Sequence, residues 1–146
     1  YRVFSTVLLR RVMWLRIMCV HRPLHHFSQS AFLRNPTTVE PLWTVSMLME
    51  HAIRHGNELW LVSLDVRKAF DTVPHASLWQ ALRQANYSAA LVEMLAALYG
   101  NCSCRVATAF GLSAPVSLRR GTKQGDPLSP WLWNTFEDML LRRLWT

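Results

Sequence analysis

Two short segments of the chain carry the residues best suited to chemistry. The first, LVSLDVRKAFDTV at 61–73, is an apolar run that ends in Asp65 and continues through an aromatic residue to Asp71. The second, SLRRGTKQGDPLSP at 117–130, is a basic loop interrupted by glycine and proline, with Gln124 at its centre. A carboxylate at the end of a buried strand can bind Mg²⁺, which prefers hard oxygen ligands. A glycine-containing loop can bring its backbone close to a nucleotide.

Asp65 has two interpretations from its position alone. It follows the apolar run LWLVSL, so it can reach solvent and metal at the mouth of a strand, as two-metal phosphoryl transfer requires. It can also cap the turn after that strand, which is a common role of aspartate in turns. Spacing alone favours the second interpretation.

In this order, the two segments resemble the first two palm motifs of reverse transcriptases, specifically those of LINE-type (non-LTR) retrotransposons. The first motif of that family is an aspartate, three intervening residues, alanine, an aromatic residue and often a second aspartate. Asp65, Ala69, Phe70 and Asp71 match it in this chain. The resemblance implies that Asp65 is the catalytic, metal-binding carboxylate and that the backbone carbonyl of Val66 is a secondary metal contact.

Phe70 and Asp71 each have two interpretations. The resemblance implies that Phe70 lies beneath the incoming sugar, where its ring excludes a 2′-hydroxyl. The alternative is a core aromatic on the turn after the strand. Asp71 is not a metal ligand in that family, so we expect it to serve helix entry or a hydrogen bond within the loop.

The second motif, R-G-x-x-Q-G-D-P-L-S-P, extends the resemblance. It implies that Gln124 and Gly125 bind the nucleotide, with the glutamine against sugar and base. Arg119, Arg120 and Lys123 lie where they could contact template or primer phosphates. Taken without the resemblance, the same segment is a turn rich in proline and glycine that precedes a helix.

The segment FSQSAFLRNPTTVEPL at 27–42 is similar to the fingers segment of the same family, matching it at Gln29, Ala31 and Phe32. A third palm motif, with two adjacent aspartates on a hairpin, has no counterpart, because the chain contains no Asp-Asp pair. We therefore expect one partial reverse transcriptase domain, fingers-like over 1–57 and palm over 58–146, truncated before the catalytic hairpin and inactive alone.

The elements that must position these motifs follow from periodicity and turn residues. The pattern predicts a helix over 3–19, a helix from a Thr37-x-x-Glu40 capping box to about His55, where Gly56 stops it, and a fully buried strand over 58–64. Helices are expected from Pro74 through Ala85, over 88–100 with Gly100 just past its end, and from Ser129-Pro130 onwards.

Two antiparallel strands, 102–110 and 114–120, are expected on either side of a turn at 111–113. The whole order is α+β, with helices packed on a small antiparallel sheet. Without a catalytic hairpin beside it, the strand over 58–64 would have unpaired edges and exposed apolar surface.

Charge points to a polyanionic partner. The formal net charge is +7, fourteen of the sixteen cationic side chains are Arg, and residues 1–39 contain six Arg and no acidic residue. The resemblance implies an RNA template, a DNA primer, deoxynucleoside triphosphates and Mg²⁺ as partners and cofactor.

No apolar run approaches 18 residues, so no membrane is expected, although a basic helix at a membrane surface is an alternative. A second alternative is a non-catalytic nucleic-acid-binding remnant. The three cysteines do not have the spacing of a disulfide framework, which fits a reducing, intracellular setting.

Overall fold

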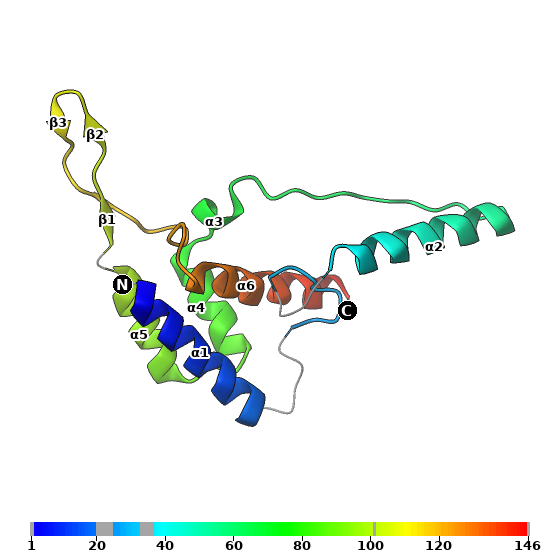
Figure 1. Cartoon of the computed structure of the whole chain (residues 1–146), viewed down its shortest axis with the longest axis horizontal. Helices are drawn as coiled ribbons and strands as arrows, with labels where there is room; N and C mark the ends of the chain where they lie inside the picture. Colours follow the sequence, from blue (N-terminus) through cyan, green and yellow to red (C-terminus); the bar gives the residue numbers. More distant parts are fainter. Residues whose placement is uncertain (1, 20–24, 33–36, 101, 146) are drawn as a thin grey trace.

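A computed structural model describes residues 2–19, 25–32, 37–100 and 102–145 of the chain (Figure 1). Side chains of residues 15–19 are not described. The elements run in the order α1 (Arg2–Cys19), α2 (Val39–His55), α3 (Ala69–Thr72), α4 (His75–Gln84), α5 (Ala89–Gly100), β1 (Ser103–Cys104), β2 (Ala107–Thr108), β3 (Gly111–Leu112), β4 (Val116–Ser117) and α6 (Leu128–Leu144). This order confirms the predicted α+β class.

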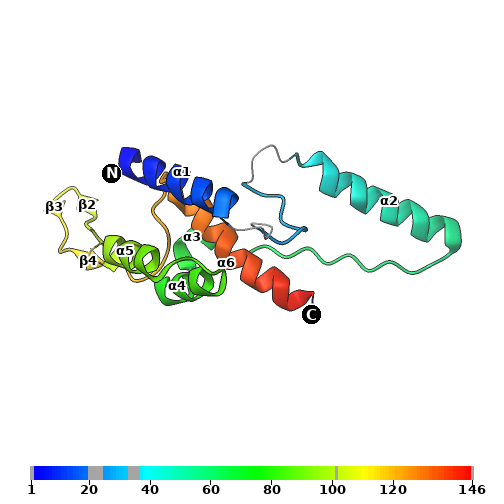
Figure 2. The same ribbon diagram turned by 90° about the horizontal axis from the view of Figure 1, so that it is seen from below.

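The hydrophobic core lies between α1, α4, α5 and α6. Figure 2 shows α6 between α1 and α4, and α6 contacts both of these helices. Leu78 and Leu82 are four residues apart and so share one face of α4, where both are fully buried. Leu95 of α5 and Leu132 of α6 have no exposed surface at all. The core therefore supports the two loops that enter α4 and α6.

Most predicted helices are present, but their ends differ in detail. Gly56 closes α2 in the left-handed conformation, with φ of 64°, and Pro74 precedes α4 in an extended conformation, as expected. The capping box is wrong, because Thr38 precedes α2 and no side chain caps the helix. Gly100 is the last residue of α5 rather than the residue after it.

The start of α6 also differs from the prediction. The helix begins at Leu128, two residues before the expected Pro130. Pro127 is the residue at the N-cap position, and the Asp126 carboxylate before it accepts a 3.1 Å hydrogen bond from the Leu128 backbone N–H, the first of the helix, which was a role expected of Ser129. The Ser129 hydroxyl instead donates to the Lys123 carbonyl at 2.6 Å, which ties the second-motif loop to the first turn of α6.

The predicted antiparallel pairing is confirmed, but its strands are shorter. β1 pairs with β4 and β2 pairs with β3, each antiparallel over two residues. The tip lies at Ala109 and Phe110 instead of 111–113, since Thr108 pairs with Gly111. Figure 1 shows this hairpin extending away from the helices, and Phe110 at its tip is fully exposed.

The fully buried strand predicted over 58–64 is wrong. This segment is extended but joins no ladder, and the side chains of Trp60, Val62 and Leu64 are each more than 80% exposed. A strand is buried only when neighbouring segments pair with it and cover its faces, and no described part of the chain does so here. The expectation of unpaired edges with exposed apolar surface is confirmed.

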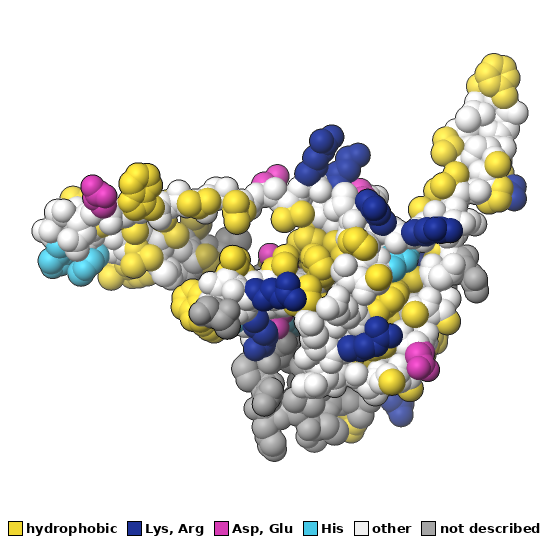
Figure 3. All heavy atoms as spheres, turned by 180° about the vertical axis from the view of Figure 1, so that it is seen from behind, with side chains coloured by type: hydrophobic (Ala, Val, Ile, Leu, Met, Phe, Trp, Pro, Cys, Tyr) yellow, Lys and Arg dark blue, Asp and Glu magenta, His cyan; other side chains and the backbone are white. Residues whose placement is uncertain are grey.

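This segment and α2 together form an arm, residues 39–66, that extends away from the core (Figure 1). Ala52 is the one residue of α2 that is buried among those described. Figure 3 shows hydrophobic side chains gathered along the arm. The exposed hydrophobic residues of the arm include Trp43, Met47, Trp60 and Val62. Among the described residues, no helix has the length and hydropathy needed to span a membrane.

Candidate functional site

The two motif segments lie side by side, although about fifty residues separate them in sequence. The Thr122 backbone N–H donates to the Phe70 carbonyl at 2.6 Å, and its hydroxyl donates to the same oxygen at 3.3 Å. The Gly121 N–H donates to the Val73 carbonyl at 2.8 Å. These bonds join the loop before α6 to the short helix α3. The backbone itself therefore holds the two motifs together.

Gly121 is required by this close approach. Its φ is +81°, a left-handed conformation that residues with a Cβ rarely adopt. A Cβ at this position would lie 2.8 Å from the Asp71 carbonyl oxygen and 2.9 Å from its Cα. Because both neighbours are backbone atoms, neither can move without shifting α3. The second-motif glycine thus allows contact with the first motif.

A side-chain hydrogen bond adds to the backbone contacts. The Gln124 amide donates through Nε2 to Oδ1 of Asp71 at 3.2 Å. This contact supports the loop hydrogen bond that was one of the two roles expected of Asp71. Both side chains are largely exposed, so they are accessible to a ligand.

An open pocket of about 360 Å³ lies where the motifs meet. It contains three of the residues proposed from the sequence as nucleotide-binding: Phe70, Gln124 and Gly125. Its full lining is Lys68, Ala69, Phe70, Asp71, Thr122, Gln124, Gly125, Asp126, Ser129 and Pro130. The volume is in the range of small-molecule sites, which are concave and carry few polar groups.

Phe70 lies between two aromatic side chains. Its ring centroid is 5.9 Å from that of Phe32, in an edge-on arrangement, and 5.8 Å from that of Trp133. The ring is half-buried and packs against the hydrophobic core while also lining the pocket. The two alternatives for Phe70, a core aromatic and a pocket residue, are therefore compatible in this fold.

Asp126 is a pocket residue that the sequence analysis treated only as part of the motif. Its side chain is 5% exposed, and Oδ1 accepts the Leu128 N–H. Within the described residues, Oδ2 is buried without a hydrogen-bond partner. An aspartate two residues before the start of a helix was the available signal for this contact.

Asp65 and Val66 do not line the pocket. Both are exposed on the arm, and Asp65 forms no hydrogen bond with any described residue. No group of three or more potential ligands from His, Cys, Asp and Glu occurs in the described ranges. One exposed carboxylate does not hold a divalent ion against its hydration shell, so these residues alone do not fit a metal site.

The cationic side chains of the second motif have different environments. Arg119 and Arg120 are exposed, and the Arg120 backbone forms a bridge with Pro74 at the entrance to α4. The Nζ atom of Lys123 lies 5.4 Å from the centroid of the Tyr99 ring, within the range of a cation–π interaction. The two arginines are thus the more accessible charges.

The fingers-like segment is bound to α6 by polar contacts that the sequence analysis did not foresee. The buried Gln29 donates to Oε2 of Glu137 at 2.8 Å, and the Asn134 amide donates to the Ala31 carbonyl at 2.7 Å. The His26 backbone N–H donates to Asp138. This attachment brings Phe32 next to Phe70. A signal for Asn134 was present in the sequence, since a polar residue in the apolar stretch 131–136 needs hydrogen-bond partners when it is buried.

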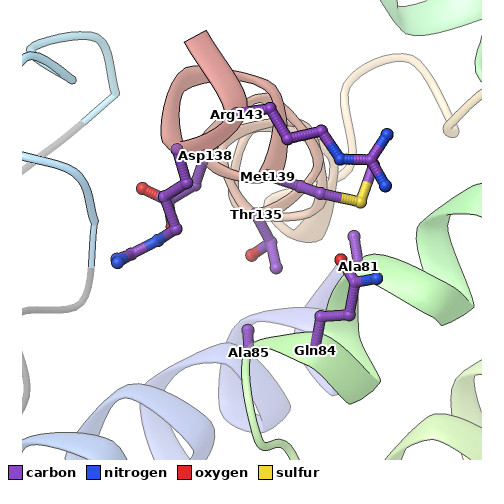
Figure 4. Close-up of a pocket in the computed structure, with 8 residues that line it drawn as sticks. Ala81, Gln84, Ala85, Thr135, Asp138, Met139 and Arg143 are labelled. Atoms are coloured by element: carbon purple, nitrogen blue, oxygen red, sulfur yellow. The ribbon is translucent and has the colours of Figure 1, made fainter. Parts of the chain in front are cut away.

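A second hollow, of about 220 Å³, lies between α4 and α6. Figure 4 shows Ala81, Gln84 and Ala85 on one side and residues of α6, including Thr135, Met139 and Arg143, on the other. Its one carboxylate, Asp138, already accepts hydrogen bonds from His26 and from Arg142, the latter at 2.7 Å. The motif pocket is therefore the better candidate for chemistry.

A family model described as reverse transcriptase (RNA-dependent DNA polymerase) matches residues 1–146. The match covers the whole chain and includes both motif segments that form the pocket. The chain therefore belongs to the reverse transcriptase family. Members of this family act on nucleic acids and generally depend on divalent metal ions.

The relatives specify the branch of the family. The chain is 34% identical over 116 residues to the Pol polyprotein of the R2 type-1 retrotransposable element of Nasonia vitripennis, and 33% identical over 116 residues to that of the R2DM type-2 element of Drosophila melanogaster. Each alignment covers 80% of this chain.

A third relative is the transposon TX1 149 kDa protein of Xenopus laevis, 32% identical over 120 residues that cover 82% of this chain. These similarities confirm the resemblance to LINE-type, non-LTR retrotransposon reverse transcriptases. The alignments span 11%, 11% and 9% of the three relatives, so the chain corresponds to about a tenth of their length.

Proposed function

We propose that this chain is the fingers and first palm part of an RNA-directed DNA polymerase, which in the complete protein transfers deoxynucleotides to a primer on an RNA template. The observation that carries the proposal is the pocket between Phe70 and Gln124. Two motifs that match the family in sequence also meet in space, through the backbone bonds of Thr122 and Gly121. Two loops that matched the family sequence only by chance would have no reason to lie in contact in the fold.

Each site residue receives a role within this proposal. Phe70, Gln124 and Gly125 bind the incoming deoxynucleoside triphosphate, with the Phe70 ring against its sugar. Asp65 supplies one carboxylate ligand and the Val66 carbonyl supplies a secondary contact to Mg²⁺ in a protein that brings further carboxylates to them. Mg²⁺ there would neutralise developing charge on the transferred phosphate. The match of these motifs to the family is also the basis on which we divide the chain into a fingers-like part, 1–57, and a palm part, 58–146.

Nucleic acid is proposed to approach over basic side chains. Arg119 and Arg120 are exposed beside the pocket loop and are suited to phosphate contact. On α1, Arg10, Arg11 and Trp14 line an open hollow with a volume of about 540 Å³. Arginine beside an exposed aromatic ring suits a single-stranded nucleic acid, because phosphate and base are contacted together.

The function is tested in a chimera in which this chain replaces the matching segment of the Nasonia vitripennis R2 relative. Primer extension on an RNA template is measured with deoxynucleoside triphosphates and Mg²⁺. Asp65→Asn should abolish extension and leave template binding and folding nearly unchanged, because Asp65 is exposed and has no hydrogen bond to lose among the described residues. Glu58→Gln, at another exposed carboxylate of the arm, is the matched control and should extend normally.

Near-normal extension by the Asp65→Asn chimera would refute the metal role. A parental chimera that folds and binds template without extending would favour a second function, a non-catalytic nucleic-acid-binding remnant. The observation that favours this alternative is the exposed position of Asp65, which belongs to no group of three potential metal ligands in the described ranges. Genomic sequence beyond Thr146 separates the two, since an open frame that reaches an Ala-Asp-Asp hairpin supports the enzyme.

A further inference from the structure

We propose that Asp71 is a positioning residue that fixes the orientation of the Gln124 side chain, so that its carbonyl oxygen is the atom offered to a nucleotide. The inference rests on the proposed function, because it assigns a purpose to a contact inside the proposed nucleotide pocket. It goes beyond the motif match, which gives roles to Asp65, Phe70 and Gln124 and none to Asp71.

The chemistry of the contact determines the orientation. A glutamine amide can be turned by 180° about its last bond, which exchanges a donor for an acceptor at nearly the same position. A carboxylate only accepts hydrogen bonds, so Asp71 selects the form in which Nε2 of Gln124 faces it. In that form the Oε1 atom of Gln124 has no hydrogen-bond partner among the described residues. A ligand with a hydroxyl or amino donor can therefore bond to it.

The backbone fixes both partners before the side chains meet. Asp71 follows Phe70, whose carbonyl accepts the Thr122 N–H at 2.6 Å. Gln124 follows Thr122 by two residues, on the loop whose Gly121 passes within van der Waals contact of the Asp71 backbone. The 3.2 Å contact thus joins two exposed side chains whose backbones are already held next to each other by these contacts. Both belong to the lining of the same open pocket.

The carboxylate of Asp71 has a second conceivable use, as a metal ligand beside Asp65. The geometry argues against it. One Asp71 oxygen is already the acceptor for Gln124, and no third potential ligand groups with it in the described part of the chain. To orient the Gln124 amide, Asp71 needs only the one hydrogen bond that it already accepts.

The test uses the full 146-residue chain and dTTP as the probe, in the presence of a chelator so that no metal contributes. Binding is followed by the side-chain amide signals of ¹⁵N-labelled glutamine. Asp71→Ala and Gln124→Ala are each expected to weaken dTTP binding by roughly 3- to 10-fold, the scale of one hydrogen bond. The double variant should be no weaker than Gln124→Ala, because Asp71 acts only through the Gln124 side chain.

Asp71→Asn separates orientation from packing. Asparagine keeps the size of the side chain but can accept from or donate to Gln124, so the amide is no longer held in one form. Its dTTP affinity should fall between that of the parent and that of Asp71→Ala, and the Gln124 amide signals should move towards those of a free glutamine. Urea unfolding midpoints of all variants are compared to exclude loss of folding.

The outcomes separate this inference from the function on which it rests. Unchanged dTTP affinity in Asp71→Ala, additive losses in the double variant, or unmoved Gln124 amide signals would each overturn the positioning role alone. Failure of the parent chain to bind dTTP at millimolar concentration would overturn the nucleotide pocket, and the positioning role with it.

Discussion

The side-chain amide of Gln29 donates a 2.8 Å hydrogen bond to Oε2 of Glu137, across 108 residues of sequence. The same amide accepts the Ala31 backbone N–H through Oε1 at 3.2 Å, so both ends of a buried polar group are satisfied. The fingers-like segment is attached to α6 by this bond and by the Asn134 contact to Ala31. The attachment matters for the pocket because it places Phe32 beside Phe70.

Glu137→Ala should therefore destabilise the fold. It leaves the Gln29 amide, 7% exposed, without its acceptor, and an unpaired buried donor costs about 1–3 kcal/mol. Glu137→Gln retains an acceptor oxygen and should recover most of the loss. The measurement is the urea unfolding midpoint, with the exposed Glu93→Ala as a control that should stay within about 0.5 kcal/mol of the parent. Equal midpoints for Glu137→Ala and Glu93→Ala would contradict the attachment.

Gly121→Ala should cost more stability than Gly125→Ala. Both glycines lie in the second-motif loop with positive φ, +81° and +74°, so both substitutions carry a backbone strain of about 1–2 kcal/mol. A Cβ at Gly121 also overlaps the Asp71 backbone at 2.8 Å, whereas nothing lies within 4 Å of a Cβ at Gly125. The overlap should add about 1–3 kcal/mol to the difference in unfolding free energy. Similar losses in the two variants would show that the motifs do not approach so closely.

Phe70→Ala should affect both stability and sugar selection. The half-buried ring contacts Phe32 and Trp133, so its removal should lower the unfolding free energy by about 1–3 kcal/mol. If the ring lies against the sugar, the active chimera carrying Phe70→Ala should also incorporate ribonucleotides more readily. Phe110→Ala, at the fully exposed hairpin tip, should change neither quantity. A destabilised variant with parental discrimination would leave Phe70 as a core aromatic only.

Nucleic-acid binding by the chain should be weak, independent of sequence and strongly reduced by salt. The net charge of +7 is the source, because phosphate contacts release condensed counterions. Arg119→Ala should lower the slope of log K against log salt by about one if the guanidinium binds a phosphate. Filter binding to single-stranded RNA at several salt concentrations measures this slope. Arg83→Ala, at another exposed arginine, on α4, should leave the slope nearly unchanged. Equal effects of the two substitutions would indicate binding without a defined path.

Local signals predicted the helices well, because their ends depend on neighbouring residues. Gly56 in the left-handed conformation and Pro74 before α4 are examples in which one residue type determines the backbone. The start of α6 was misplaced because Asp126 and Ser129 are both good capping residues. Only the packing of the loop decides which of them caps the helix.

Features that depend on distant partners could not be read from the sequence. The apolar run ending in Asp65 has the composition of a buried strand, yet burial requires neighbours that composition does not reveal. The motif match named Gln124, but nothing in the chain indicated that Asp71 would accept its hydrogen bond. The roles of Asp65 and Val66 remain predictions.

The separation of Asp71 from Gln124 by 53 residues has a consequence for how the pocket is made during translation. A ribosome adds about 5–20 residues per second, so the first motif emerges roughly 3–10 s before its partner. Throughout that interval Phe70 lacks the Thr122 bonds that attach it, while the apolar arm before it is already outside the exit tunnel. During this interval the unattached first motif adds to the apolar surface that the nascent chain exposes. Slow codons between α4 and α6 would lengthen the interval, and chaperone capture there would protect the unfinished pocket.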